Sequence, residues 1–193
     1  GVFVFVFSCF CLGVGRSWWL VGLLCNAASR DDFPGSRAWR SIPSEAESLA
    51  WLRDRELIRE LPQRYAHGID TDDWQKVASV FHPDCQVQGT LNTAPIRPYL
   101  EALEPGVKAY QATLHFMGNQ YVELARDGDP NRGHVETYAV AYHIEPEDSA
   151  NDDLVMGVRY CDTVVRIAEL GDWRIIHRHV IKQWHRGPLP RPS

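Results

Sequence analysis

The sequence predicts an α+β domain in which helices come first and a mainly antiparallel sheet follows. Apolar residues recur at helical spacing between residues 44 and 103, and they alternate as in strands between residues 112 and 184. The period changes only once along the chain, and turn-forming residues separate the strand-like runs. Helices segregated in this way pack on one face of a curved sheet, and such a fold can enclose a pocket.

The first helix is expected to begin at Ser44, because Glu47 follows three residues later and the two form a capping box. Its apolar face is marked by Leu49, Leu52, Leu57, Ile58, Leu61 and Tyr65. Pro62 is a position at which this helix can kink, and Gly68 is expected to end it.

Two shorter helices are expected to follow. Residues 72–81 carry acidic residues in their first turn, and His82-Pro83-Asp84 is expected to close this helix. Residues 96–103 predict the third helix, with Pro98 near its start and Pro105-Gly106 after its end.

Four long runs rich in Val, Ile, Thr and Tyr predict the strands. They cover residues 112–124, 133–144, 154–168 and 173–184. The segments between them are rich in Asp, Gly, Pro and Asn, which are the residues that turns favour.

The folded domain is expected to span residues 44–186, with a linker at 26–43 and a disordered tail at 187–193. Residues 1–25 are almost wholly apolar, barely long enough for a membrane span of about 20 residues, and lack the basic start of a signal peptide. We favour a non-native extension, or translation begun upstream of the true start, over export. Residues 1–43 are therefore expected to lie outside the fold.

Composition narrows the classes of partner. A net charge of −5 and a pI of about 5.9 argue against a nucleic-acid-binding surface. Five cysteines, with no CxxC and no metal-type spacing, favour reduced thiols. We expect a cytoplasmic protein, exported only if residues 1–25 are a genuine signal sequence, whose folded domain does not bind membranes.

An acid–histidine pair is the strongest sign of chemistry in the chain. Asp70 follows the first predicted helix, and His115 lies near the start of the first long predicted strand. A carboxylate beside a histidine fixes its tautomer and stabilises the imidazolium, so the pair would act as a general base. Asp70 could instead cap the second helix, and His115 could be a hydrogen-bonded core residue.

Six motifs occur in the order that a known family shows: RYAxGxD, FHPD, THFxGN, ETYxxAYH, GxRYxD and WRIxxR. Over residues 45–186 the chain therefore resembles the SnoaL-like domain, a member of the cone-shaped superfamily of nuclear transport factor 2 and scytalone dehydratase. The resemblance implies three N-terminal helices packed on the curved sheet. Within that superfamily the chain is most similar to the lyase branch, which includes scytalone dehydratase, bile-acid dehydratase and hexachlorocyclohexane dehydrochlorinase.

The resemblance implies that Tyr65, Asp70 and His115 are the catalytic residues. The candidate substrate-binding residues are Glu136 and Tyr138, which share a face by strand alternation, together with Asn119, Arg159 and Arg178. Some of these residues could instead have a purely structural role. Tyr65 could be a core aromatic, Glu136 an edge charge, and Arg159 a partner of Asp162 or Glu136.

The resemblance and these residues together imply a cofactor-independent lyase, most similar to a dehydratase, that acts on a small cyclic hydrophobic substrate in an apolar pocket. No cofactor is expected, because the chain carries neither GxGxxG nor a P-loop. No metal is expected, since His177, His179 and His185 fit exposed strand positions better than a metal site. The alternatives are an isomerase or polyketide cyclase with the same pocket, or a non-catalytic ligand-binding or dioxygenase β-subunit-like module. The resemblance also implies a homo-oligomer, a dimer or a trimer.

Overall fold

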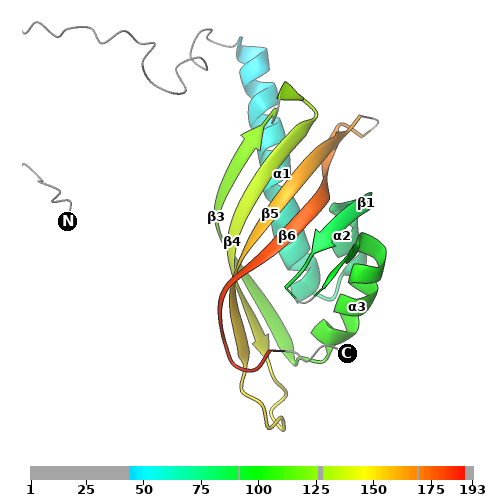
Figure 1. Ribbon diagram of the computed structural model, residues 1–193. Coiled ribbons are helices and arrows are strands. Elements are labelled where there is room, and N and C mark those ends of the chain that lie inside the picture. The colour runs from blue at the N-terminus through cyan, green and yellow to red at the C-terminus, as the bar shows by residue number, and fades with distance from the viewer. Residues whose placement is uncertain (1–43, 91, 126–127, 169, 190–193) are drawn as a thin grey trace, which may run out of the picture. The chain divides into compact units, whose positions relative to one another are not determined.

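The computed structural model describes residues 44–90, 92–125, 128–168 and 170–189, all within the unit Pro43–Ser193. The expectations for residues 1–43 and 190–193 lie outside these residues. Figure 1 shows the arrangement, a curved and unclosed sheet with helices on one of its faces. Within the described residues, no helix is both long and apolar enough to span a membrane.

The long helix α1 spans Glu45–Asp70, and its capping box is present as predicted. The Ser44 hydroxyl accepts from the Glu47 backbone N–H over 3.2 Å, and the Glu47 carboxylate accepts from the Ser44 backbone N–H over 2.8 Å. Gly68 does not end the helix, which continues to Asp70, where the Thr71 hydroxyl donates to the carbonyl of His67 over 2.7 Å.

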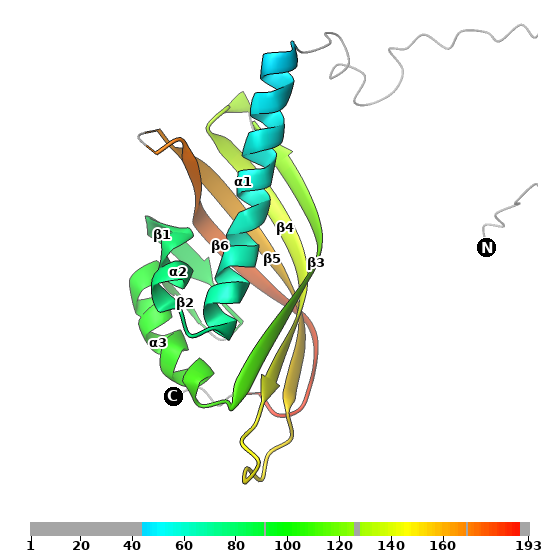
Figure 2. The ribbon, with the colours of Figure 1, turned by 180° about the vertical axis from the view of Figure 1, so that it is seen from behind.

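The apolar packing of α1 on the sheet comes from its second half. Its buried apolar residues are Ile58, Leu61, Tyr65, Ala66 and Ile69. Leu49 and Leu52, which the sequence pattern assigned to the buried face, are 60% and 53% exposed. That assignment is wrong because the start of α1 projects beyond the sheet, as Figure 2 shows from behind.

The region after α1 differs most from the prediction. Helix α2 is shorter than expected and spans Trp74–Ser79, with the Asp73 carboxylate accepting from the Lys76 backbone N–H. The expected turn at His82-Pro83-Asp84 lies inside a strand, β1 (Phe81–Gln88), which buries Phe81, Cys85 and Val87. The ladder between β1 and β6 is interrupted between Phe81 and Gln86, so Pro83 lies where no donor is required.

A short strand, β2 (Thr93–Pro95), precedes helix α3 (Ile96–Lys108). The prediction that α3 ends at Leu103 is wrong, because the helix includes Pro105 and Gly106. Leu103 and Val107, four residues apart, both pack against the core. This packing outweighs the low helix propensity of proline and glycine in the last turns.

The four long strands lie close to where the sequence placed them. They are β3 (Ala112–Leu124), β4 (Arg132–Ile144), β5 (Leu154–Ile167) and β6 (Asp172–Arg186). The strand order is β2-β1-β6-β5-β4-β3, and every neighbouring pair is antiparallel except β1 and β6. β3 therefore forms one edge of the sheet, beside α1.

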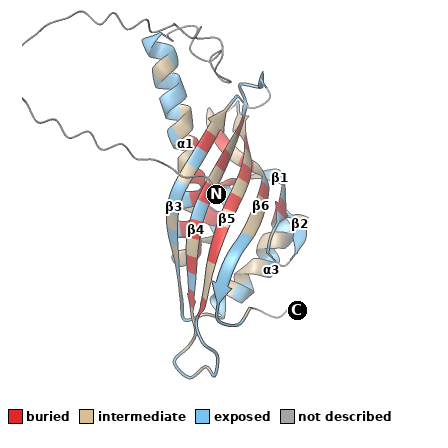
Figure 3. Cartoon of the chain, turned by 60° about the vertical axis from the view of Figure 1, so that its left-hand side comes forward, coloured by how far each residue is buried: buried red, intermediate tan, exposed pale blue. Residues whose placement is uncertain are grey.

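Buried and more exposed residues alternate along β4, so the two faces of the sheet differ. Figure 3 colours the strands by burial. Odd-numbered residues of β4 from Val135 to His143 are buried on the concave face, which packs against the helices. Even-numbered residues of β4 lie on the opposite, outer face and are more exposed. A one-residue bulge between Met117 and Gln120 shifts this alternation in β3.

Gly68 is expected to be required for the close packing of α2 against α1. A methyl group on Gly68 would lie 2.7 Å from Cγ2 of the buried Val77, whereas one on Gly106 in α3 would have no neighbour within 4 Å. We expect Gly68→Ala to lower the free energy of unfolding by about 1–3 kcal/mol. Gly106→Ala should raise it by about 0.5–1 kcal/mol, because alanine favours helix. Urea unfolding of both variants measures this, and a Gly68→Ala protein as stable as the wild type would contradict the packing.

Candidate active site

Asp70 and His115 meet where the last turn of α1 lies beside the first half of β3. The ring nitrogen Nδ1 of His115 lies 2.7 Å from Asp70 Oδ1. The backbone N–H of His115 donates to Asp70 Oδ2 over 2.7 Å, and the Thr113 hydroxyl donates to Oδ1 over 2.9 Å. The predicted contact between the two side chains is present, and three groups of one short strand segment surround the carboxylate.

The ionisation of Asp70 decides which ring nitrogen of His115 carries hydrogen. Burial by itself raises the pKa of Asp70, but the hydrogen bonds from His115 and Thr113 outweigh burial and lower this pKa below its ordinary value. An ionised carboxylate only accepts hydrogen bonds, so Nδ1 of His115 is the donor. In neutral His115 the other nitrogen, Nε2, then carries the lone pair that a general base needs.

Tyr65 lies on the buried face of α1 and packs edge-on against His115, with ring centroids 6.4 Å apart. Its ring also contacts Phe81 and Tyr160, each at 5.9 Å between centroids. Burial raises the pKa of Tyr65 well above its ordinary value. The phenol is therefore protonated at neutral pH, and it can donate a hydrogen bond but not act as a base.

Arg178 on β6 and Asp162 on β5 form a fully buried ion pair on the same concave face. Arg178 donates from Nε over 2.8 Å and from Nη2 over 2.7 Å to the two carboxylate oxygens. The guanidinium carbon lies 4.4 Å from the centre of the Tyr65 ring, which connects the pair to the catalytic candidates. Its third nitrogen, Nη1, is buried without a hydrogen-bond partner among the described residues, so one of its donors is unused.

His143 on β4 belongs to this cluster, although the sequence reasoning assigned it no role. Its ring lies 6.1 Å from the His115 ring, and its Nδ1 lies 3.3 Å from the carbonyl oxygen of Leu154. Burial lowers the pKa of His143, so the side chain is neutral at neutral pH. His143 is the last residue of the motif ETYxxAYH, which was the only sign of it in the sequence. In the structure it pairs across the sheet with Thr113, the hydroxyl donor to Asp70.

Four of the five predicted substrate-binding residues lie away from His115. His115 pairs with Ala141 on β4, so the odd-numbered residues of β4 share its face, and Glu136 and Tyr138 lie on the other one. The prediction that they line the same pocket is wrong, because alternation shows which residues share a face but not which face packs on the helices.

Arg159 and Asn119 require the same correction. Arg159 lies on the outer face, where its guanidinium forms an ion pair with Glu136 at 3.3 Å and lies over the Tyr138 ring, which is the structural alternative named above. Asn119 lies at the β3 bulge and lines a hollow of the outer face. Of the eight site residues predicted from the sequence, the structure therefore brings together Tyr65, Asp70, His115 and Arg178.

A pocket of about 510 Å³ lies between α1 and β3 and includes Asp70 and His115 in its lining. Arg59, Gln63 and Gln120 line it as well, so its wall is partly polar. Gln120 accepts from Arg59 Nε and from Gln63, each over 3.3 Å, and these bonds connect the two sides of the pocket. The wholly apolar pocket expected from the sequence stays a prediction.

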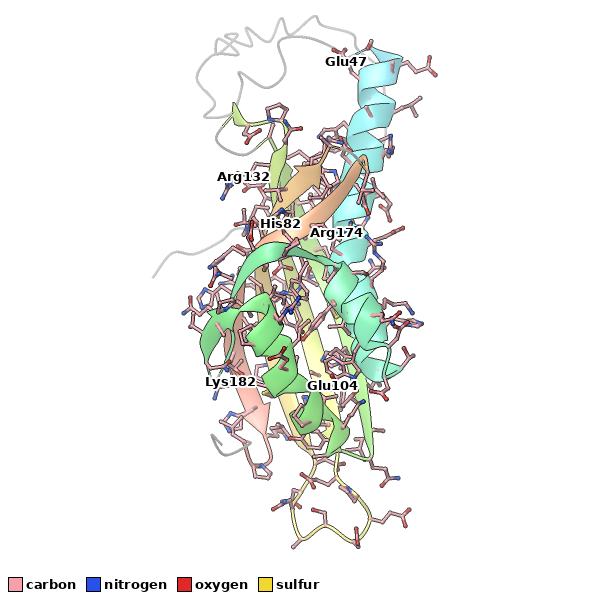
Figure 4. The ribbon with its side chains drawn as sticks, turned by 90° about the vertical axis from the view of Figure 1, so that its right-hand side faces the viewer. Glu47, His82, Glu104, Arg132, Arg174 and Lys182 are labelled. Carbon is pink, nitrogen blue, oxygen red and sulfur yellow. The ribbon has the colours of Figure 1, made fainter. Side chains whose placement is uncertain are left out.

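The described residues hold no group of three or more His, Cys, Asp or Glu side chains that could bind a metal ion. Cys85 and Cys161 are free, and burial raises the pKa of the Cys85 thiol to about 12. The charged residues labelled on α1, α3 and β6 in Figure 4 (Glu47, Glu104 and Lys182) lie at the periphery of the domain.

Residues 50–179 of the chain match the SnoaL-like domain family. This range includes all the residues of the buried cluster described above, from Tyr65 to Arg178. The chain belongs to this family. The SnoaL-like domain lies in the superfamily of nuclear transport factor 2, whose cone fold agrees with the curved sheet and its helices. No curated protein sequence matches the chain.

Several solved structures share this SnoaL-like fold. A scytalone dehydratase-like protein of Novosphingobium aromaticivorans superposes with a TM-score of 0.64 at 19% identity, covering 76% of this chain and 95% of that chain. The LinA-type3 hexachlorocyclohexane dehydrochlorinase of Novosphingobium barchaimii gives 0.62 at 14% identity, covering 75% and 99%. A Kribbella flavida protein gives 0.60 at 23% identity, covering 74% and 95%. At these identities the likeness shows the fold alone.

Proposed function

We propose that this protein is a cofactor-independent lyase that removes water from a small cyclic hydrophobic substrate. The observation that carries the proposal is the Asp70–His115 pair, in which the carboxylate accepts from Nδ1 of the ring, so that Nε2 is the nitrogen that can take up a proton. Two of the similar structures are named a dehydratase-like protein and a dehydrochlorinase. Both names denote eliminations, in which a carbon loses a proton and its neighbour loses a leaving group.

The first step is the removal of a proton from a carbon next to a carbonyl group. Nε2 of His115 accepts this proton, the C–H bond breaks, and its electron pair passes toward the carbonyl oxygen. Asp70 stabilises the imidazolium that forms, because its ionised carboxylate already accepts from Nδ1. A positioned base of this kind contributes about 10²–10⁴-fold to the rate.

The second requirement is a donor for the negative charge that develops on oxygen. Tyr65 fits this role because its phenol keeps its proton and its ring packs beside His115. Arg178 fits it through Nη1, which has no partner among the described residues. Donors that are fixed in place and shielded from water stabilise such a charge more strongly than water does.

The last step closes the cycle without a redox change. The electron pair returns to form a C=C bond, the C–O bond to the hydroxyl breaks, and His115 returns its proton to the departing oxygen as water forms. The substrate loses one water molecule, and the enzyme regains its starting protonation state. The reaction therefore needs no electron acceptor.

Loss of water from cyclic β-hydroxy ketones in deuterated water tests this proposal directly. We expect proton NMR to show the unsaturated ketone appearing, and His115→Gln to slow this reaction by about 10²–10⁴-fold, because the base is lost. His134→Gln is the matched control, since His134 is also mostly buried but lies on the outer face. Deuterium uptake without loss of water would indicate an isomerase instead, and no reaction with any of the ketones would argue for a ligand-binding module.

Tyr65→Phe tests whether the phenol acts on the substrate or only packs. The change keeps the buried ring and removes one hydroxyl, whose loss in a dry site costs about 1–3 kcal/mol. We expect turnover to fall by roughly one to two powers of ten, with a nearly unchanged melting temperature. A lower melting temperature with unchanged turnover per folded molecule would assign Tyr65 to the core alone.

A further inference from the structure

The pocket between α1 and β3 extends along the helix, well beyond the Asp70–His115 pair. Its α1 wall includes Arg59, Gln63, His67 and Asp70, which follow one another at intervals of three or four residues. Side chains at this spacing lie on one face of a helix, so they form a continuous stripe. At about 1.5 Å per residue, the stripe from Arg59 to Asp70 is roughly 16 Å long. A molecule that fills the pocket from end to end is therefore elongated.

The part of the pocket between its two ends is apolar. At one end Asp70 contacts His115, and at the other end Arg59 contacts Gln120, so residues 116–118 of β3 lie between them. These residues, Phe116, Met117 and Gly118, line the pocket together with Ala66 of α1. Apolar walls of this kind suit the hydrocarbon rings of a bound molecule, because their burial is favourable and needs no polar partner.

The end of the pocket distant from His115 carries an arginine that Gln120 holds in place. The side-chain oxygen of Gln120 accepts from Arg59 Nε over 3.3 Å, and its nitrogen donates to the backbone carbonyl of Arg59 over 3.0 Å. Gln63 donates to the same Gln120 oxygen, also over 3.3 Å. The guanidinium of Arg59 is thus anchored through Nε, and its terminal nitrogens Nη1 and Nη2 extend beyond this anchor.

The charge of Arg59 is only weakly balanced within the protein. Glu56 lies 3.4 Å from Arg59 Nη1, but the side chains of Glu56 and Arg59 are 62% and 40% exposed. An exposed ion pair of this kind contributes little, because water screens it. The described lining includes one carboxylate, that of Asp70, and both of its oxygens already accept hydrogen bonds from Thr113 and His115. The Arg59 end of the pocket therefore favours an anionic group.

We infer that the molecule this pocket takes up, the substrate of the proposed reaction, is an elongated cyclic carboxylic acid. Arg59 binds its carboxylate at one end of the pocket, and His115 reacts with the other end. A carboxylate fits because its single charge matches one arginine and its two oxygens can accept from Nη1 and Nη2 in parallel. A phosphate carries close to two charges at neutral pH and would need more donors. This inference rests on the proposed function, because it names the class of molecule on which His115 acts.

A matched pair of substrates tests the inference. The first is a fused bicyclic β-hydroxy ketone with a carboxylate on the ring distant from the carbonyl, and the second is the primary amide of the same acid. We expect the wild type to have a kcat/KM for the acid about ten- to a hundred-fold higher, because the amide loses a charge-assisted hydrogen bond. The difference should lie in KM, since the carboxylate is bound equally before and during the reaction. Added salt should reduce the difference, because Arg59 is partly exposed.

Arg59→Gln should remove this preference, so that the acid and the amide have a similar kcat/KM. Arg55→Gln is the matched control, because it removes the same charge one turn earlier on α1. Arg55 lies over the Trp51 ring and outside the lining of the pocket, so this variant should keep the wild-type preference. An amide that the wild type uses as well as the acid would overturn the inference. A preference for the acid that survives in Arg59→Gln would overturn it as well.

Calorimetric binding of the same two molecules separates this inference from the proposed reaction. If neither ketone loses water, the proposed reaction is wrong, but tighter binding of the acid that Arg59→Gln abolishes would still support the carboxylate site. If both ketones lose water with equal kcat/KM, the proposed reaction stands and the inference fails. An acid that does not bind to the wild type would overturn the inference in either case.

Discussion

The candidate site depends on the hydrogen bonds between Asp70 and His115. Asp70 is the last residue of α1, where the helix dipole disfavours a carboxylate by about 0.3–1 kcal/mol. Donors from one short segment of β3, the Thr113 hydroxyl and the backbone and ring N–H groups of His115, offset this cost and keep the carboxylate ionised. Because β3 is an edge strand, the carboxylate also covers a backbone donor that another strand could otherwise use. One side chain thus joins the helix to the sheet edge and selects the tautomer of the candidate base.

Strand alternation gives the two faces of the sheet different properties. The concave face holds Arg178 and Asp162 as a buried, doubly hydrogen-bonded pair, which offsets the cost of removing both charges from water. Charges and dipoles that are fixed in such a dry interior act strongly on a bound molecule. The outer face instead exposes aromatic rings around the Arg159–Glu136 ion pair. The same strands therefore carry a candidate reaction centre on one side and exposed aromatic rings on the other.

The sequence predicts those parts of the fold that local patterns control. The Ser44–Glu47 capping box, the four long strands and the contact of Asp70 with His115 are all present. The strand β1 could not be predicted, because Pro83 and its polar neighbours resemble a turn and only pairing with β6 makes them a strand. The sequence also could not predict which face of the sheet carries Glu136, Tyr138 and Arg159, since this depends on which side of the sheet the helices cover. His143 became recognisable only through its pairing with Thr113.

The tautomer of His115 is the most direct test of this account, and nitrogen-15 NMR of the histidine rings measures it. His115→Gln identifies the His115 signals among those of the eight histidines. At neutral pH we predict that Nδ1 of His115 carries the hydrogen and Nε2 does not, because ionised Asp70 accepts from Nδ1. In Asp70→Asn the population of the other tautomer should rise. A wild-type ring with hydrogen on Nε2 would contradict the account, because His115 would then have no free nitrogen directed away from Asp70 to accept a proton.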